Sequence, residues 1–240
     1  MAIGQTMSKQ ITGISSMATR QMLAELVAEY ERRSGRHAII ESVGGVAAAR
    51  RVEEGEPFDI VVLAADAIDR LALAGWIDPA SRVDLARSGV AIAVAAGAPR
   101  PEIGTEAAVR DAILASRMIG YSTGPSGSHL SRLFERWGIA EAIAPRIVQA
   151  PPGVPVGALV ARGEVELGFQ QLSELMHLPG IDVIGSLPPE IQFISVFSAA
   201  VCTASDQHAA AGELITFLAS PQADSVKRRH GMEPSGGDCK

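Results

Sequence analysis

The chain has 240 residues, of which 47% are hydrophobic and 20% charged, and its net charge is −6 at pH 7. These values are typical of a soluble globular protein with one large domain or two lobes of about 100 residues each. The negative charge and an aromatic content of 4% argue against nucleic acid and anionic membrane as main partners.

The first third of the chain alternates short apolar segments with amphipathic ones, a pattern typical of strands followed by helices. We predict strands at Ile11–Ile14, His37–Ser42 and Phe58–Ala64, and helices at Met17–Arg33, Val46–Glu54 and Asp66–Ala74. Ser15 or Ser16 is expected to cap the first helix, and Gly35 to end it. Three strand–helix units in succession predict a parallel α/β lobe.

A long apolar run, Gly89–Ala96, predicts a crossover into a second lobe, where the alternation restarts. A second long run, Ile191–Thr203, suits a return crossover before the closing helices Asp206–Leu218 and Pro221–Arg229. We therefore predict an α/β fold of two lobes, each a mixed sheet flanked by helices, with a ligand cleft between them. Lobe 1 is assigned residues 11–87 and 197–240, lobe 2 residues 88–196, and a flexible N-terminal segment residues 1–10.

Four small-residue turns precede predicted helices: Ser15-Ser16, Gly44-Gly45, Ser126-Gly127 and Gly153-Val154-Pro155. Unpaired backbone N–H groups at a helix start carry partial positive charge, and small side chains let a ligand approach them. Four such turns predict a site for a small anion, with Val156 after the last turn as a further contact. Each turn also has an ordinary interpretation as a helix cap or tight turn.

Other polar residues fall near the predicted strand ends. Ser122, Gln170 and Gln171 are candidate ligand contacts, although structural hydrogen bonding explains the amides equally well. Arg87 could pair bidentately with a carboxylate or form a surface salt bridge.

Proton transfer would need a base beside an acidic C–H bond. The candidate bases are His129, Glu41 and Glu174, and no motif identifies any of them. The histidines lack metal-ligand spacing and the glycine turns match no nucleotide motif, so we expect no metal and no cofactor. Cys202 is expected to be a buried free thiol.

Three segments carry a resemblance to a known family: Val52–Val61, Val160–Gly168 and Phe217–Ala223. Through them the chain resembles, over residues 11–234, the molybdate-binding branch of the type II periplasmic binding proteins. The resemblance implies that Ser15 or Ser16 is one ligand-binding serine. A second serine of the family falls on Gly44 or Gly45, and a tyrosine common near the cleft falls on Gln171. These replacements imply a larger pocket than molybdate requires.

Two further segments, Pro155–Glu164 and Leu167–Leu175, are similar to bacterial aconitate isomerases, which belong to the same branch. Tyr121-Ser122, Ser126-Gly127 and Leu130–Arg132 add to that similarity. It implies a di- or tricarboxylate ligand and a 1,3-proton shift.

We therefore expect a monomeric protein that binds a molybdate-class oxyanion or an organic carboxylate as the substrate-binding component of an ABC transporter. The alternative is a cofactor-independent enzyme that interconverts cis- and trans-aconitate. The transporter hypothesis implies a permease partner and a periplasmic location if a leader has been removed. Met1–Gln10 is polar and shows no apolar core of a signal peptide. If no leader has been removed, we therefore expect a cytoplasmic location. Neither hypothesis involves nucleic acid or membrane insertion.

Overall fold

The computed structural model describes residues 9–151 and 153–236, so most of the segment predicted to be flexible lies outside the described residues. The chain divides into two compact units. Unit 1 comprises described residues 9–86, 197–228 and 234–236, and unit 2 comprises 87–151, 153–196 and 229–233. Two strands, β4 (Val83–Ala95) and β9 (Ile194–Val201), carry the chain from one unit to the other.

Unit 1 is built on a mixed sheet with strand order β2-β1-β3-β9. Its other strands are β1 (Ile11–Ser16), β2 (Ala38–Val43), β3 (Ile60–Ala64) and the short β10 (Glu233–Pro234) at the boundary. Strand β1 pairs in parallel with both β2 and β3, while β9 pairs antiparallel with β3. Residues 60–63 are fully buried, which explains why this strand is apolar throughout.

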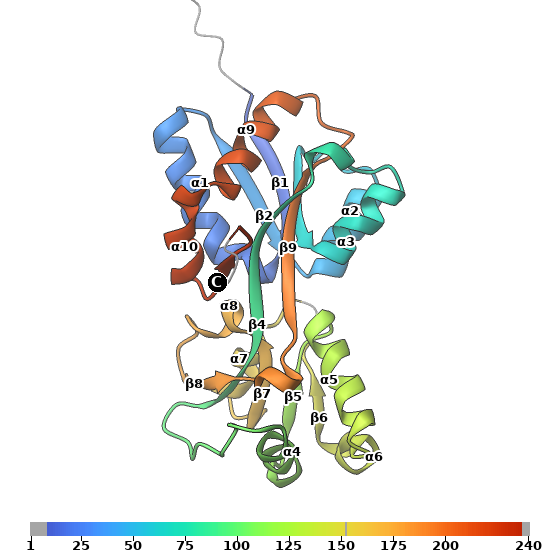
Figure 1. Cartoon of the computed structure of the whole chain (residues 1–240), viewed down its shortest axis with the longest axis vertical. Helices are drawn as coiled ribbons and strands as arrows, with labels where there is room; N and C mark the ends of the chain where they lie inside the picture. Colours follow the sequence, from blue (N-terminus) through green and yellow to red (C-terminus); the bar gives the residue numbers. More distant parts are fainter. Residues whose placement is uncertain (1–8, 152, 237–240) are drawn as a thin grey trace, which may run out of the picture. The chain divides into compact units, whose positions relative to one another are not determined.

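Helices cover both faces of this sheet. They are η1 (Met17–Thr19), α1 (Arg20–Ser34), α2 (Gly45–Glu53), α3 (Ala65–Leu73), η2 (Pro79–Ser81), α9 (His208–Ala219), η5 (Pro221–Ala223) and α10 (Asp224–Arg229). Figure 1 shows α1 and α9 on one side of the sheet and α2 and α3 on the other. Ile14, Val61 and Ile68 belong to the core beneath α2 and α3.

Unit 2 has the strand order β4-β7-β5-β6, with β8 paired to β4. The strands are β5 (Ile119–Tyr121), β6 (Ile147–Gln149), β7 (Leu167–Gln171) and β8 (Ile181–Ser186). Strand β5 is parallel to β6 and β7, and β4 runs antiparallel to β7 and β8. The three parallel strands therefore all end at one edge of the sheet.

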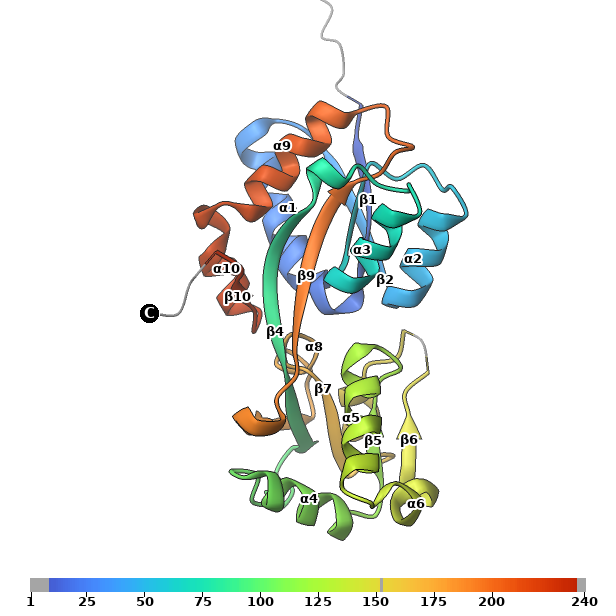
Figure 2. The ribbon, with the colours of Figure 1, turned by 45° about the vertical axis from the view of Figure 1, so that its right-hand side comes forward.

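The helices of unit 2 are α4 (Glu106–Ala115), α5 (Pro125–Arg136), α6 (Ala140–Ile143), η3 (Ala144–Arg146), α7 (Val156–Ala161), α8 (Leu172–Leu175) and η4 (Pro189–Ile191). Figure 2 shows α5 lying along β5. Gly120 and Gly168 allow α7 to approach the other face, because a Cβ added to Gly120 would lie 3.2 Å from Val156 and one added to Gly168 would lie 2.6 Å from Val160. This close packing places the start of α7 beside the ends of β5 and β7.

The observed elements follow the predicted alternation, with three corrections. Strand β4 begins at Val83 rather than Gly89, because sheet pairing accommodates polar residues that hydropathy alone excludes. Helix α5 begins at Pro125, where proline fits the first helical position, rather than after the Ser126-Gly127 turn. Neither Ser15 nor Ser16 caps a helix by a side-chain hydrogen bond.

Two smaller predictions are confirmed. Gly35 ends α1 in the left-handed conformation with φ 70°, and Cys202 is a buried free thiol. In the described part of the chain, no helix is both long and apolar enough to span a membrane.

Candidate functional site

In unit 1, the predicted site residues gather where parallel strands β1 and β2 end. Ser15 pairs in register with Ser42, and Ser16 with Val43. Gly44 and Gly45 follow directly, where β2 passes into α2. The carboxyl edge of parallel strands is where ligands bind in open α/β sheets.

The two serines at the end of β1 differ in their hydrogen bonding. Ser15 is completely buried, and its Oγ lies 2.8 Å from the Oγ of Ser42. Ser16 is 7% exposed, and its Oγ has no hydrogen-bond partner among the described residues. Because a buried hydroxyl normally has a partner, the geometry favours Ser16 as the ligand-binding serine.

Gly44 and Gly45 form the start of α2. Gly44 occupies the N-cap position and supplies no side-chain cap, so the first N–H groups of this nine-residue helix lack that partner. A Cβ added to Gly45 would lie 3.7 Å from the Cβ of Ser16, and one added to Gly44 would meet no atom within 4 Å. Ser16 therefore faces an open, partially positive helix start.

Glu41, one candidate base, is engaged elsewhere. Its Oε1 accepts a hydrogen bond from Arg51 at 2.7 Å, and that bond holds the pKa of Glu41 below its usual value. A lowered pKa makes a carboxylate a weaker base, so the geometry gives Glu41 no advantage in proton transfer.

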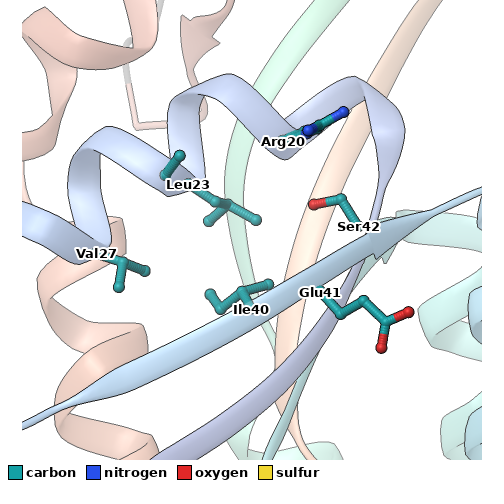
Figure 3. Close-up of a pocket in the computed structure, with 7 residues that line it drawn as sticks. Arg20, Leu23, Val27, Ile40, Glu41 and Ser42 are labelled. Atoms are coloured by element: carbon teal, nitrogen blue, oxygen red, sulfur yellow. The ribbon is translucent and has the colours of Figure 1, made fainter.

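A pocket of about 420 Å³ lies in unit 1 between α1 and the outer strand β2 (Figure 3). Leu23, Val27 and Ile40 form its apolar part, while Arg20 and Ser42 lie toward the start of α1. Ala24 and Glu41 complete the lining. The pocket is on the α1 side of β2, whereas Ser16 faces α2.

In unit 2, the end of β5 and the start of α5 form a second small-residue turn. Gly124 is the N-cap of α5, and Ser126 and Gly127 lie in its first turn rather than before it. The Oγ atoms of Ser122 and Ser126 lie 3.2 Å apart. A Cβ on Gly127 would lie 1.7 Å from the carbonyl oxygen of Ser122, so only glycine permits this approach.

His129, the second candidate base, is partly buried on α5. Its Nε2 lies 2.9 Å from the carbonyl oxygen of Ile191, and its ring stacks on Phe193 with centroids 5.1 Å apart. Because a carbonyl oxygen only accepts, this contact assigns the proton to Nε2 and leaves Nδ1 as the acceptor. The contacts are those of a packed structural histidine.

Gln170 connects the start of α7 to α8. Its Oε1 accepts a hydrogen bond from the backbone N–H of Val156 at 2.8 Å, and its Nε2 donates to Oε2 of Glu174 at 2.7 Å. The N–H of Val156 is therefore engaged within the protein. Glu174 is partly buried, and this desolvation raises its pKa to about 7 despite the opposing hydrogen bond.

Gln171 is buried at the end of β7 and hydrogen-bonded to the neighbouring strands. With its nitrogen toward the backbone, the Gln171 amide donates to the carbonyl oxygens of Ser88 at 2.8 Å and Gly89 at 3.2 Å. Its oxygen then accepts from the Oγ of Ser195 at 2.7 Å. Arg87 is partly buried on β4. The bonds of Gln171 favour its structural interpretation.

The structure thus brings the predicted residues together in two groups, one at the carboxyl edge of each unit. The first contains Ser15, Ser16, Gly44 and Gly45, and the second Ser122, Ser126, Gly127, Val156 and Gln171. Neither group contains a metal cluster, because no three His, Cys, Asp or Glu side chains converge within the described ranges. The prediction of a ligand cleft between the two lobes stays a prediction.

The prediction of site residues from the sequence did not use the spacing of Gln170 and Glu174. Four positions separate them across a strand–helix junction, which allows their side chains to meet. Burial raises the pKa of Glu174 and Gln170 holds its carboxyl group in place, so Glu174 is a stronger candidate base than either Glu41 or His129.

Solved structures of known proteins share the fold of this chain. The periplasmic molybdate-binding protein of Azotobacter vinelandii superposes with a TM-score of 0.77 at 20% identity, covering 92% of this chain and 98% of that one. The sulfate-binding protein SubI of Mycobacterium tuberculosis H37Rv gives a TM-score of 0.75 at 17% identity, covering 95% and 88%. The fold is that of the type II periplasmic binding proteins, as predicted.

The family follows from the sequence comparisons. Residues 11–233 match the family described as bacterial extracellular solute-binding protein, and the chain belongs to this family. Over 230 residues the chain is also 36% identical to an aconitate isomerase from a Pseudomonas species. That alignment covers 93% of this chain and 87% of the relative.

Proposed function

We propose that this protein binds a small unsaturated polycarboxylate and isomerises it, with aconitate as the substrate. The observation that carries the proposal is the 36% identity to an aconitate isomerase over 93% of the chain. The relative of known activity therefore aligns with both groups of candidate residues, rather than with one unit alone.

The geometry of unit 1 supports a carboxylate ligand. Ser16 offers a buried hydroxyl without a partner among the described residues, and Gly44 and Gly45 leave the start of α2 open. A carboxylate at this position would accept hydrogen bonds from the hydroxyl and from backbone N–H groups, and the helix dipole would favour its charge. A serine in place of either glycine would narrow the space.

The start of α5 in unit 2 offers comparable chemistry. Ser122 and Ser126 carry hydroxyl groups at the first turn of a twelve-residue helix, and Gly127 holds that turn against the end of β5. A substrate with three carboxylates needs several such donors. We propose that the reaction uses no metal or organic cofactor, because an allylic proton shift only moves a proton and electron pairs within the substrate.

The test is ligand binding followed by turnover. Purified protein is titrated calorimetrically with cis-aconitate, trans-aconitate, citrate, molybdate and sulfate, and the two aconitates are then followed by proton NMR. We expect binding of the aconitates and their interconversion. Binding of molybdate or sulfate without any aconitate binding contradicts the proposal.

A second candidate is supported by the family itself, whose members are extracellular solute-binding proteins. In that case the protein delivers an anion to an ABC permease from the periplasm and does not alter it. Tight binding of an anion without turnover, together with recovery of the native protein from the periplasmic fraction, would favour this candidate.

A further inference from the structure

Glu174 differs from other acidic residues of unit 2 in its electrostatic environment. Glu106 accepts hydrogen bonds from Trp137 and Arg136, and Asp182 accepts them from the Gly97 N–H and Arg100, and these contacts lower the pKa of each carboxyl. Glu174 instead receives one hydrogen bond from a neutral amide, and burial raises its pKa to about 7. Removing a carboxylate from water without a counter-ion is costly, and such groups are concentrated at functional sites.

The described elements of unit 2 that pack next to Glu174 carry few charged groups. Strand β7 and helices α7 and α8 pack together and contain no other ionisable side chain. Segment 229–233, which packs against α8 through Gly231, carries Arg229, His230 and Glu233. His177, just after α8, bonds to His230 at 3.1 Å. The rise in the pKa of Glu174 comes from burial and is opposed by the hydrogen bond from Gln170.

Gln170 fixes the position of the carboxyl group. Because its Oε1 is held by the N–H of Val156, its Nε2 must point toward Glu174. The adjacent Ser173 is 5% exposed, and its Oγ has no hydrogen-bond partner in the described part of the chain. Gln170 lies near the end of β7 and Glu174 on α8 directly after it, at the same sheet edge as the end of β5, which leads to Ser122 and α5.

We propose that Glu174 is the catalytic base that carries the proton in aconitate isomerisation, with Gln170 as its positioning residue, an inference that rests on the function proposed above. The carboxylate removes a proton from the methylene carbon, and the C–H electron pair forms a new C=C bond to the central carbon. The electron pair of the former double bond accepts the same proton at the far carbon. Nothing is oxidised or reduced, and Glu174 is ionised again at the end.

The first test compares Glu174→Gln with the unaltered protein, because glutamine has the same shape but cannot take a proton from carbon. Interconversion of the aconitates is followed by proton NMR in D₂O, and binding of trans-aconitate by calorimetry. We expect kcat to fall by about 10²- to 10⁴-fold, while Kd changes by less than about threefold. Glu141→Gln, an exposed residue of the same unit, is the control and should keep full activity.

The second test uses Gln170→Met and measures how kcat/KM depends on pH. A purely structural role of Gln170 would leave this pH profile unchanged. The hydrogen bond from Gln170 lowers the pKa of Glu174, so its loss should move the acidic limb of the kcat/KM profile to higher pH. If the unaltered protein is active and Glu174→Gln keeps its rate within about threefold, the base assignment is wrong while the proposed function stands. If the unaltered protein binds aconitate without turnover, both are overturned.

Discussion

The hydroxyl oxygens of Ser15 and Ser42 lie 2.8 Å apart on neighbouring parallel strands, at the sheet edge where the ligand-binding residues were predicted. This hydrogen bond engages the Ser15 hydroxyl within the protein, which gives Ser15 a structural role. The adjacent Ser16, on the opposite face of the same strand, keeps a buried hydroxyl without a partner among the described residues.

Ser16→Ala should weaken binding of trans-aconitate without destabilising the fold. A hydrogen bond to a charged group contributes about 1.5–3 kcal/mol, so Kd should rise roughly ten- to a hundredfold. The melting temperature should be unchanged or slightly higher, because the variant removes an unsatisfied buried hydroxyl. Ser15→Ala is the matched control. It loses the hydrogen bond to Ser42, so it should lower the free energy of unfolding by about 1 kcal/mol, and it should raise Kd less than Ser16→Ala does. Equal binding effects from the two variants would refute the assignment.

Gly45→Ser should change ligand preference. The new Cβ would make only an ordinary contact, 3.7 Å from that of Ser16, so the chain should fold normally. The added hydroxyl narrows the start of α2, and it supplies the serine that the molybdate-binding relatives are expected to have there. We expect weaker binding of trans-aconitate and stronger binding of molybdate, measured by calorimetry. Gly44→Ser should instead act as a helix cap and stabilise the protein by a few tenths of a kcal/mol.

Gly127→Ala should destabilise the protein, although alanine normally stabilises a helix relative to glycine. The new Cβ would lie 1.7 Å from the carbonyl oxygen of Ser122, so the backbone of α5 or of the preceding loop must move. Overpacking of this kind costs about 1–3 kcal/mol or more, which calorimetry would detect as a clear fall in melting temperature. Gly124→Ala, whose Cβ would lie 3.8 Å from the nearest atom, should have little effect. A normal melting temperature for Gly127→Ala would contradict this account.

Stability should fall as pH rises through the titration range of Glu174. Its pKa is about 7 in the folded protein, against 4.5 for an unperturbed glutamate, so between these values the folded state binds more protons than the unfolded state. The full loss is at most on the order of 3 kcal/mol, since one pKa unit corresponds to about 1.4 kcal/mol. Glu174→Gln should therefore melt at a higher temperature than the unaltered protein at about pH 8, and the gain should shrink at about pH 5.

Glu141→Gln serves as the control for this comparison, because Glu141 is exposed on α6. The same melting-temperature difference for Glu174→Gln at both pH values would show that burial of Glu174 does not control this part of the stability profile.

Several features of the fold could be predicted because they depend on local pattern. The alternation of apolar strands with amphipathic helices located most elements, and small-residue turns marked the start of α2 and the region where α5 begins. The bounds of β4 could not be predicted in this way. Asp84, Arg87 and Ser88 lie within that strand, and their polarity hides it from a hydropathy pattern.

The sequence by itself determined the strand–helix order, the family and the positions of the glycine and serine turns, because these depend on neighbours along the chain. Only the tertiary structure decided which residues of those turns remain available to a ligand. Ser15 is bonded to Ser42 while Ser16 has no such bond among the described residues, and the amide of Gln171 is taken up by Ser88 and Ser195. Likewise, the raised pKa of Glu174 arises from burial in the folded protein. Many hydrogen-bond partners, and the burial of a side chain, depend on residues that are far apart in the chain and meet only in the folded protein. A local sequence pattern therefore does not reveal them.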